Sequence, residues 1–184
     1  MMNIDTDQLN QGVPLQDQNI ATNQFLTFIL GDEEYGVDIL NVQEIRSWQP
    51  ATAIPNTPDY VLGVINLRGL VVPIIDLRKR FAMDRAEFGP TTIIVIVKLS
   101  GKTGSPKTVG MVVDEVSDVY NISDDDIGEM PEIGSVVGTE FIKGLTTVNE
   151  KMVIILDTET LINTGVLGDD SVQGSSESQA GLAK

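Results

Sequence analysis

The sequence contains no cysteine and no histidine, and these two absences remove much of the common chemistry of active sites and metal sites. Without cysteine the chain has no disulfide, no thiolate nucleophile and no sulfur ligand for a metal. Without histidine it lacks the usual general base near neutral pH and the commonest metal ligand. We therefore expect no enzyme activity, no bound metal and no cofactor.

Aromatic residues and long hydrophobic runs are also scarce. Only 5% of the residues are aromatic, which is lean for a protein that binds bases or sugars. No stretch approaches the roughly eighteen uncharged apolar residues of a membrane-spanning helix. The first twenty residues are polar and acidic, unlike a secretory signal. We expect a cytoplasmic protein that does not insert into the membrane.

The formal net charge is −15, and this charge would repel nucleic acids and anionic membranes. We therefore expect no nucleic-acid partner. The charge is uneven, since residues 46–107 hold nine basic and four acidic side chains. We interpret the basic run Arg78–Arg80 as cations that solvate the end of a helix, where they meet the negative pole of its dipole.

The polar ends, 1–23 and 166–184, read as flexible arms around a folded part at 24–165. Alternating apolar residues predict a hairpin from 24–30 and 35–38. The irregular period between Val42 and Ile45 predicts a twist or β-bulge. Thr57 followed by Pro58 predicts a short helix that extends to about Leu62.

The sequence carries an internal repeat. Residues 63–81 match residues 144–162 at a constant offset of 81, and Gly36 matches Gly110. Two copies of about five short strands predict a mainly β fold of two small five-stranded barrels that pack on each other. We place barrel 1 at about 36–88 with strand 24–30, and barrel 2 at about 92–160. The identical pairs in the long match are Gly63/Gly144, Val72/Val153, Ile74/Ile155 and Asp76/Asp157.

Residues that only one copy carries are free to serve function, whereas shared residues are more typical of framework. Arg68 and Gly69 have no counterpart, and they fall at the predicted hairpin tip between 64–67 and 70–75. A guanidinium there suits a carboxylate, and Glu44 is its predicted intramolecular partner. The alternative is an ordinary exposed salt bridge worth about 0–1 kcal/mol.

Other motifs resemble known ligand-binding loops but lack the residues that those loops require. Gly101-Lys102-Thr103 resembles the end of a phosphate-binding loop but lacks the upstream glycine. Asp124–Asp126 lacks the glycine and the final acid of a calcium loop. Asp76 and Asp157 recur at equivalent predicted helix starts, which is typical of caps. A carboxylate-based hydrolase that uses Asp76, Asp114 or Asp157 remains the alternative from a different class of protein.

Three segments closely resemble the CheW-like domain family of bacterial chemotaxis. This resemblance implies two SH3-like barrels and an adaptor that binds the cytoplasmic tips of chemoreceptors and the regulatory domain of the CheA histidine kinase, at membrane-associated arrays. The same fold also suits an adaptor of another receptor–kinase pathway, such as surface motility. The segments are LGDEEYGVDILNVQEIR (30–46), PNTPDYVLGVINLRGLVVPIIDLRKRF (55–81) and VGMVVDEVSDVYNI (109–122).

The resemblance further implies a receptor-binding groove between the barrels. By motif it assigns Val42, Glu44, Gly63, Leu67 and Arg68 to this groove. Glycine at 63 would let a receptor helix approach closely, so we expect substitution there to block binding without affecting the fold. The kinase contact is expected at an apolar barrel end.

Overall fold

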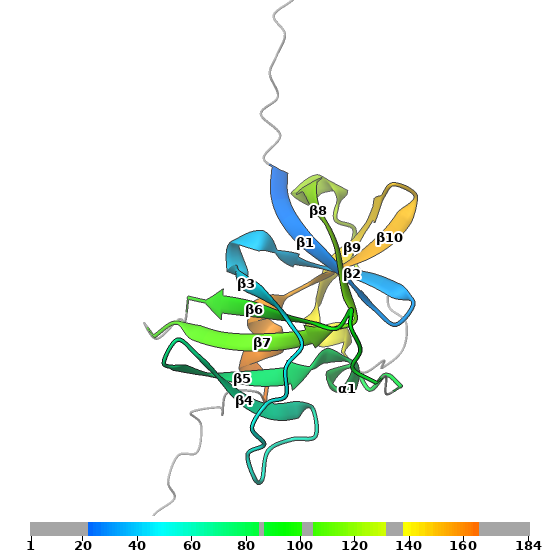
Figure 1. Ribbon diagram of the computed structural model, residues 1–184. Helices are drawn as coiled ribbons and strands as arrows, with labels where there is room; N and C mark the ends of the chain where they lie inside the picture. The colour runs from blue at the N-terminus through cyan, green and yellow to red at the C-terminus, as the bar shows by residue number, and fades with distance from the viewer. Residues whose placement is uncertain (1–21, 85–86, 101–104, 132–137, 166–184) are drawn as a thin grey trace, which may run out of the picture.

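The computed structural model describes residues 22–84, 87–100, 105–131 and 138–165, and its strands form two five-stranded sheets (Figure 1). This confirms the predicted mainly β fold with two five-stranded units. In spatial order, sheet A contains β8 (Glu115–Ser123), β1 (Thr22–Leu30), β2 (Glu33–Asp38), β10 (Lys151–Leu156) and β9 (Ile142–Val148). Sheet B contains β3 (Val42–Ser47), β6 (Ile93–Leu99), β7 (Lys107–Val113), β5 (Leu70–Asp76) and β4 (Val61–Leu67).

Short helical segments connect these strands, and none of the helices in the described ranges has the length and hydrophobicity needed to cross a membrane. They are η1 (Ile39–Asn41), α1 (Leu77–Arg80), η2 (Asp124–Asp126), η3 (Thr139–Phe141) and α2 (Thr158–Asn163).

Each sheet is assembled from both copies of the repeat. The first copy supplies β1 to β5 and the second supplies β6 to β10. Sheet A joins the hairpin β1–β2 to β8, β9 and β10, while sheet B joins the hairpin β6–β7 to β3, β4 and β5. Both joints are parallel, since β2 pairs with β10 and β5 pairs with β7. The two copies have therefore exchanged their first hairpins.

This exchange corrects the predicted barrel boundaries. The hairpin at 24–38 lies in the sheet of β8 to β10, whereas β6 and β7 lie with the strands of the first copy. The reason is η1, whose tight turn carries the chain from β2 in sheet A to β3 in sheet B, so these successive strands do not pair. β1 begins at Thr22, within the predicted arm 1–23. The rest of that arm and the tail 166–184 lie outside the described residues.

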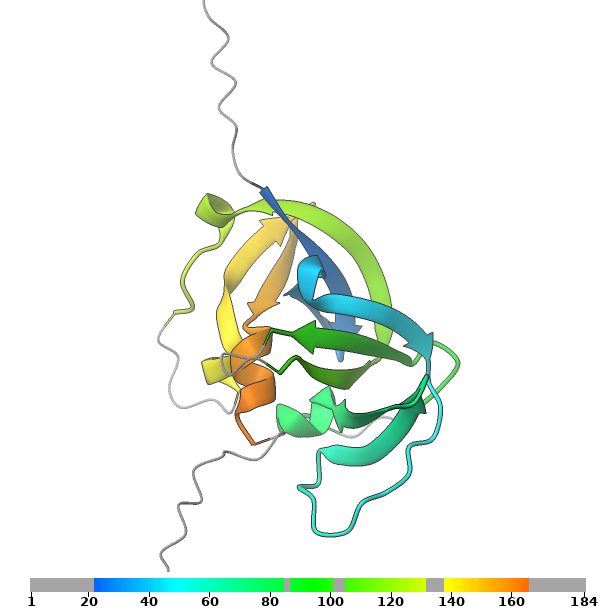
Figure 2. The same cartoon turned by 90° about the vertical axis from the view of Figure 1, so that its left-hand side faces the viewer.

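Each sheet curls until its two edge regions meet (Figure 2). In sheet B the segment after β3 reaches β4 through one bridge, Thr52 to Val64. In sheet A the segment after β8 reaches β9 through the equivalent bridge, Gly128 to Leu145. We call the two meeting lines the sheet B seam and the sheet A seam.

The largest hydrophobic cluster joins the two sheets. It brings Phe28 and Val37 of sheet A together with Ile75, Val95 and Met111 of sheet B, and all five side chains are almost fully buried. Smaller clusters fill sheet B and sheet A separately. The expected packing of the two units on each other is thus confirmed.

Several local predictions can be checked directly. Asp76 caps α1 by accepting from the amides of Arg78 and Lys79, and Asp157 caps α2 in the same manner. The register of β3 shifts between Val42 and Glu44, which confirms the predicted bulge. The helix predicted from Thr57 is absent, because β4 already begins at Val61 to pair with Ile75 of β5.

The interpretation of the basic run as a solvated helix end also needs correction. Arg78 donates from Nε to Oδ1 of Asp114 at 2.8 Å and from Nη2 to Oδ2, and Asp114 also accepts from the amide of Gly31 at 2.7 Å. The guanidinium of Arg80 lies 4.3 Å from the ring centre of Phe141. These contacts tie α1, beside sheet B, to the β1–β2 turn of sheet A and to η3.

Candidate functional site

Glu44 and Arg68 form an ion pair at the sheet B seam, as the sequence predicted. Oε2 of Glu44, on the edge strand β3, lies 3.4 Å from Nη2 of Arg68, at the tip of the β4–β5 hairpin. Oε1 of Glu44 lies 3.5 Å from Nη1 of Arg46. One carboxylate therefore contacts two guanidinium groups, and one of those belongs to the opposite edge of the seam.

The backbone of the hairpin tip holds Arg68 in place. Arg68 has φ of 52° and Gly69 has φ of 88°, so both residues adopt the left-handed conformation of a tight two-residue turn. The side chain of Asn66 supports this turn by accepting from the amide of Gly69 at 2.8 Å. The turn thus fixes the backbone of Arg68, although the side chain of Arg68 is 77% exposed.

An exposed pair of this kind contributes about 0–1 kcal/mol to stability. Arg68 can therefore exchange Glu44 for a carboxylate of another protein at small cost. This suits the side chain for recognition better than for stabilising the fold.

Gly63 lies at the seam, but its surroundings differ from the prediction. Its φ is 134°, and a Cβ atom built there would lie 2.1 Å from the backbone oxygen of Thr52. That oxygen accepts from the amide of Val64 at 2.9 Å in the bridge that closes sheet B. Glycine at 63 is thus required by the fold itself. The expectation that substitution would spare the fold is wrong.

The remaining two predicted residues are less accessible than Arg68. Leu67 is only 4% exposed and belongs to the hydrophobic cluster inside sheet B. Its side chain packs inward while the next residue points outward at the tip. Val42 is half-buried, packs against the cluster between the sheets and follows η1 directly. The structure therefore brings Glu44 and Arg68 together, and it places Val42 on the same strand as Glu44.

Exposed apolar side chains beside the tip were missed by the sequence reasoning. Leu70 and Val71 follow Gly69 directly and are 49% and 62% exposed, and Ile45 follows Glu44 on β3 and is also exposed. The repeat was misleading here, because Val71 matches Met152 and residues shared by both copies were interpreted as framework. Both are exposed, at 62% and 63%.

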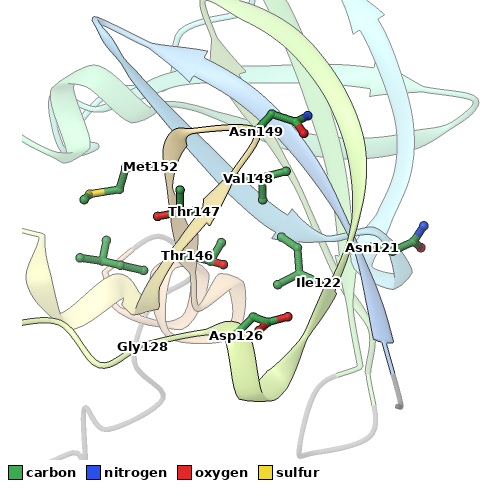
Figure 3. Close-up of a pocket in the computed structure, with 10 residues that line it drawn as sticks. Asn121, Ile122, Asp126, Gly128, Thr146, Thr147, Val148, Asn149 and Met152 are labelled. Atoms are coloured by element: carbon green, nitrogen blue, oxygen red, sulfur yellow. The ribbon is translucent and has the colours of Figure 1, made fainter. Parts of the chain in front are cut away.

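The sheet A seam carries a different ion pair, between Asp124 of η2 and Lys143 of β9 at 3.7 Å, and its hairpin tip takes no part in it. Its hairpin tip is Asn149-Glu150, which stands where sheet B has Arg68-Gly69. An open cavity of about 620 Å³ lies here between the end of β8 and the β9–β10 hairpin (Figure 3). Among the described residues that line it, Asp126 is the one with a titratable side chain.

The acids of the hydrolase alternative all have structural partners. Asp76 and Asp157 accept backbone amides at the starts of α1 and α2. Asp114 pairs with Arg78, and this hydrogen-bonded contact raises the pKa of the guanidinium further above its already high value. Asp76 and Asp114 thus both hold Arg78, one through its amide and the other through its guanidinium, and Asp157 holds the start of α2.

The comparisons with known proteins agree with the architecture. A family model described as the CheW-like domain matches residues 24–165. The chain is 43% identical to the chemotaxis protein CheW of Klebsiella aerogenes, over 77% of this chain and 82% of that protein. It is 39% identical to a probable chemotaxis protein CheW of Rhizobium etli, over 79% of this chain and 90% of that protein.

A solved structure of a CheW protein is also similar to this chain. The crystal structure of a scaffolding protein CheW from Thermoanaerobacter tengcongensis superposes with a TM-score of 0.68 at 33% sequence identity. The match covers 77% of this chain and 88% of that chain. The similarity thus extends over both sheets.

Proposed function

Because this chain belongs to the CheW-like domain family, we propose that it is a non-enzymatic adaptor that couples chemoreceptors to the histidine kinase CheA. The observation that carries this proposal is the match of residues 24–165, nearly the whole described fold, to proteins named for chemotaxis and for scaffolding. The adaptor would act in the cytoplasm, at receptor arrays on the membrane.

The sheet B seam is the proposed contact for the receptor tip. An amphipathic helix can lay an apolar stripe against Ile45, Leu70 and Val71 while one of its carboxylates takes Arg68. Glu44 then keeps Arg46 as its partner, so that it is not left unpaired. Gly63 and Leu67 would support this surface from below by holding the seam and the hairpin in place.

The kinase contact is proposed at a separate apolar end of the fold. Leu40, in η1, is 86% exposed and is the most exposed of the large hydrophobic side chains in the described ranges. The regulatory domain of CheA, itself built from barrels of this family, would cover it. Separate surfaces allow one adaptor to hold both partners at once.

Reconstitution tests the proposal. The full chain is mixed with a receptor cytoplasmic fragment and a CheA-type kinase, and kinase autophosphorylation is measured with and without each component. We expect receptor control of the kinase to require the chain. If the chain binds neither protein, the proposed function is overturned. If it couples only the receptor and kinase of another pathway, such as surface motility, the second adaptor role replaces chemotaxis.

A further inference from the structure

Arg46 is the second cation of the sheet B seam, and it is much less exposed than Arg68. Glu44 and Arg46 are two residues apart on β3, in an unbroken register with β6, so their side chains share one face of the strand. The Arg46 side chain is 33% exposed, against 77% for Arg68. Glu44 therefore has one partner that is held beside it and one that is free to turn outward.

The repeat indicates that the two arginines serve something other than the fold. Of the three charged residues at the seam, only the acid keeps its type in the second copy. There Oδ1 of Asp118 accepts from the amide of Val119 at 2.7 Å, so that acid has a partner without either arginine. The matched pairs are Glu44/Asp118, Arg46/Tyr120 and Arg68/Asn149.

The two guanidinium groups and one carboxylate leave the seam with one positive charge in excess. When Arg68 turns to a carboxylate of a partner, the negative charge of Glu44 stays beside it on the edge strand. Unneutralised, this charge would repel the incoming carboxylate. Nη1 of Arg46, at 3.5 Å from Oε1 of Glu44, supplies the charge that cancels it.

We propose that Arg46 is a positioning residue of the receptor contact, and that it makes the sheet B seam select a receptor helix with a carboxylate beside its apolar stripe. Arg46 acts through Glu44, whose charge it neutralises, and does not touch the receptor itself. This role rests on the proposed function, because it concerns the same contact.

The first test is calorimetry of the full chain with the receptor cytoplasmic fragment. Arg46→Met keeps an apolar stem but removes the charge, and we expect it to weaken binding about five- to tenfold. Glu44→Gln removes the charge that Arg46 neutralises, so adding Arg46→Met to Glu44→Gln should change the affinity by less than about twofold. Lys143→Met is the matched control, because it removes a cation paired with one acid in sheet A, and it should bind normally.

This rescue distinguishes positioning from the other roles. An equal loss from Arg46→Met with and without Glu44 would mean that Arg46 contacts the receptor or holds the fold, and it would overturn the positioning role. Wild-type affinity in Arg46→Met would overturn it as well. Arg46→Lys keeps the charge and should bind within about threefold of the wild type. Arg46→Gln repeats the test if circular dichroism shows that Arg46→Met is unfolded.

The second test identifies the carboxylate of the receptor. Each acidic residue at the tip of the fragment is changed to its amide, and binding is measured with the wild type and with Arg46→Met. One amide variant should bind the wild type more weakly and be insensitive to Arg46→Met. If none of them couples to Arg46, selection for an acid is overturned. A wild-type chain that does not bind the fragment overturns the receptor contact and this role together, whereas normal binding without coupling overturns this role alone.

Discussion

Gly36 of β2 lies opposite Ile155 of β10, and the repeat reproduces this relationship between Gly110 of β7 and Ile74 of β5. A Cβ atom at position 36 would lie 2.9 Å from Cδ1 of Ile155, and one at position 110 would lie 2.5 Å from Cδ1 of Ile74. In each pair, a glycine of one copy therefore packs against an isoleucine of the other copy. They form the joints of the exchanged hairpins.

Gly110→Ala should destabilise the fold by about 1–3 kcal/mol, because the added methyl group would overpack a buried joint. Besides Ile74, it would meet Cγ2 of Ile94 at 2.9 Å, and both isoleucines are fully buried. Urea unfolding followed by circular dichroism measures the loss. Gly89→Ala is the control, since nothing lies within 4 Å of its added Cβ. Equal stability of the two variants would contradict the close packing of Gly110 against Ile74.

The repeat could be found in the sequence because both joints need the same residue types. Gly36/Gly110 and Ile74/Ile155 are identical for one packing reason. Which copy each hairpin pairs with could not be found, since an exchanged pairing and an unexchanged one bring together the same residue types. The three residues of η1 decide between them, and their sequence carries no strong turn signal.

Gly63→Ala tests the closure of sheet B. The new Cβ would collide with the backbone of Thr52 at a φ of 134°, so we expect a loss of about 3 kcal/mol or more. Hydrogen exchange gives the local readout, because the amides of Thr52 and Val64 donate to each other's carbonyl oxygens. Both amides should lose protection before the rest of the sheet. Unchanged protection and stability would show that glycine at 63 is not needed for closure.

Asp114→Asn should cost about 1–3 kcal/mol, because the carboxylate serves Arg78 and the amide of Gly31 together. Urea unfolding measures the loss, and exchange of the Gly31 amide locates it. Asp124→Asn is a suitable control, since Asp124 pairs with Lys143 at 3.7 Å on the exposed surface and should cost less than about 1 kcal/mol. A smaller effect at Asp114 than at Asp124 would contradict the role given to Arg78.

Tyr35 should make the protein less stable at high pH. Burial, together with the hydrogen bond from its hydroxyl to Glu33 at 3.0 Å, raises the pKa of the phenol well above its ordinary value. The folded state then keeps a proton that the unfolded state loses, so the contribution of Tyr35 to stability is constant below a pH of about 10 and falls above it. Tyr35→Phe should remove this fall, whereas Tyr120→Phe should retain it. Urea midpoints across the alkaline range check both variants.

The candidate site was only partly accessible to sequence reasoning. Glu44 and Arg68 could be paired in advance, because opposite charges on an edge strand and a hairpin tip have few other partners. The inward orientation of Leu67 and the contact of Gly63 with Thr52 could not be foreseen, since both depend on how the sheet curls. Val71 was missed because both copies carry an apolar residue there, and the match with Met152 was interpreted as framework although both side chains are exposed.

Arg68→Glu is the decisive substitution at the seam. It reverses the charge opposite Glu44 and removes the donor proposed for the receptor, but it changes a side chain that is 77% exposed. We expect a stability loss of at most about 1 kcal/mol and loss of receptor binding by tenfold or more. Calorimetry with the receptor fragment at two salt concentrations measures binding, and urea unfolding confirms the fold. Lys143→Glu, an equal charge reversal in sheet A, should bind the receptor normally. A folded Arg68→Glu protein with wild-type affinity would remove Arg68 from the site.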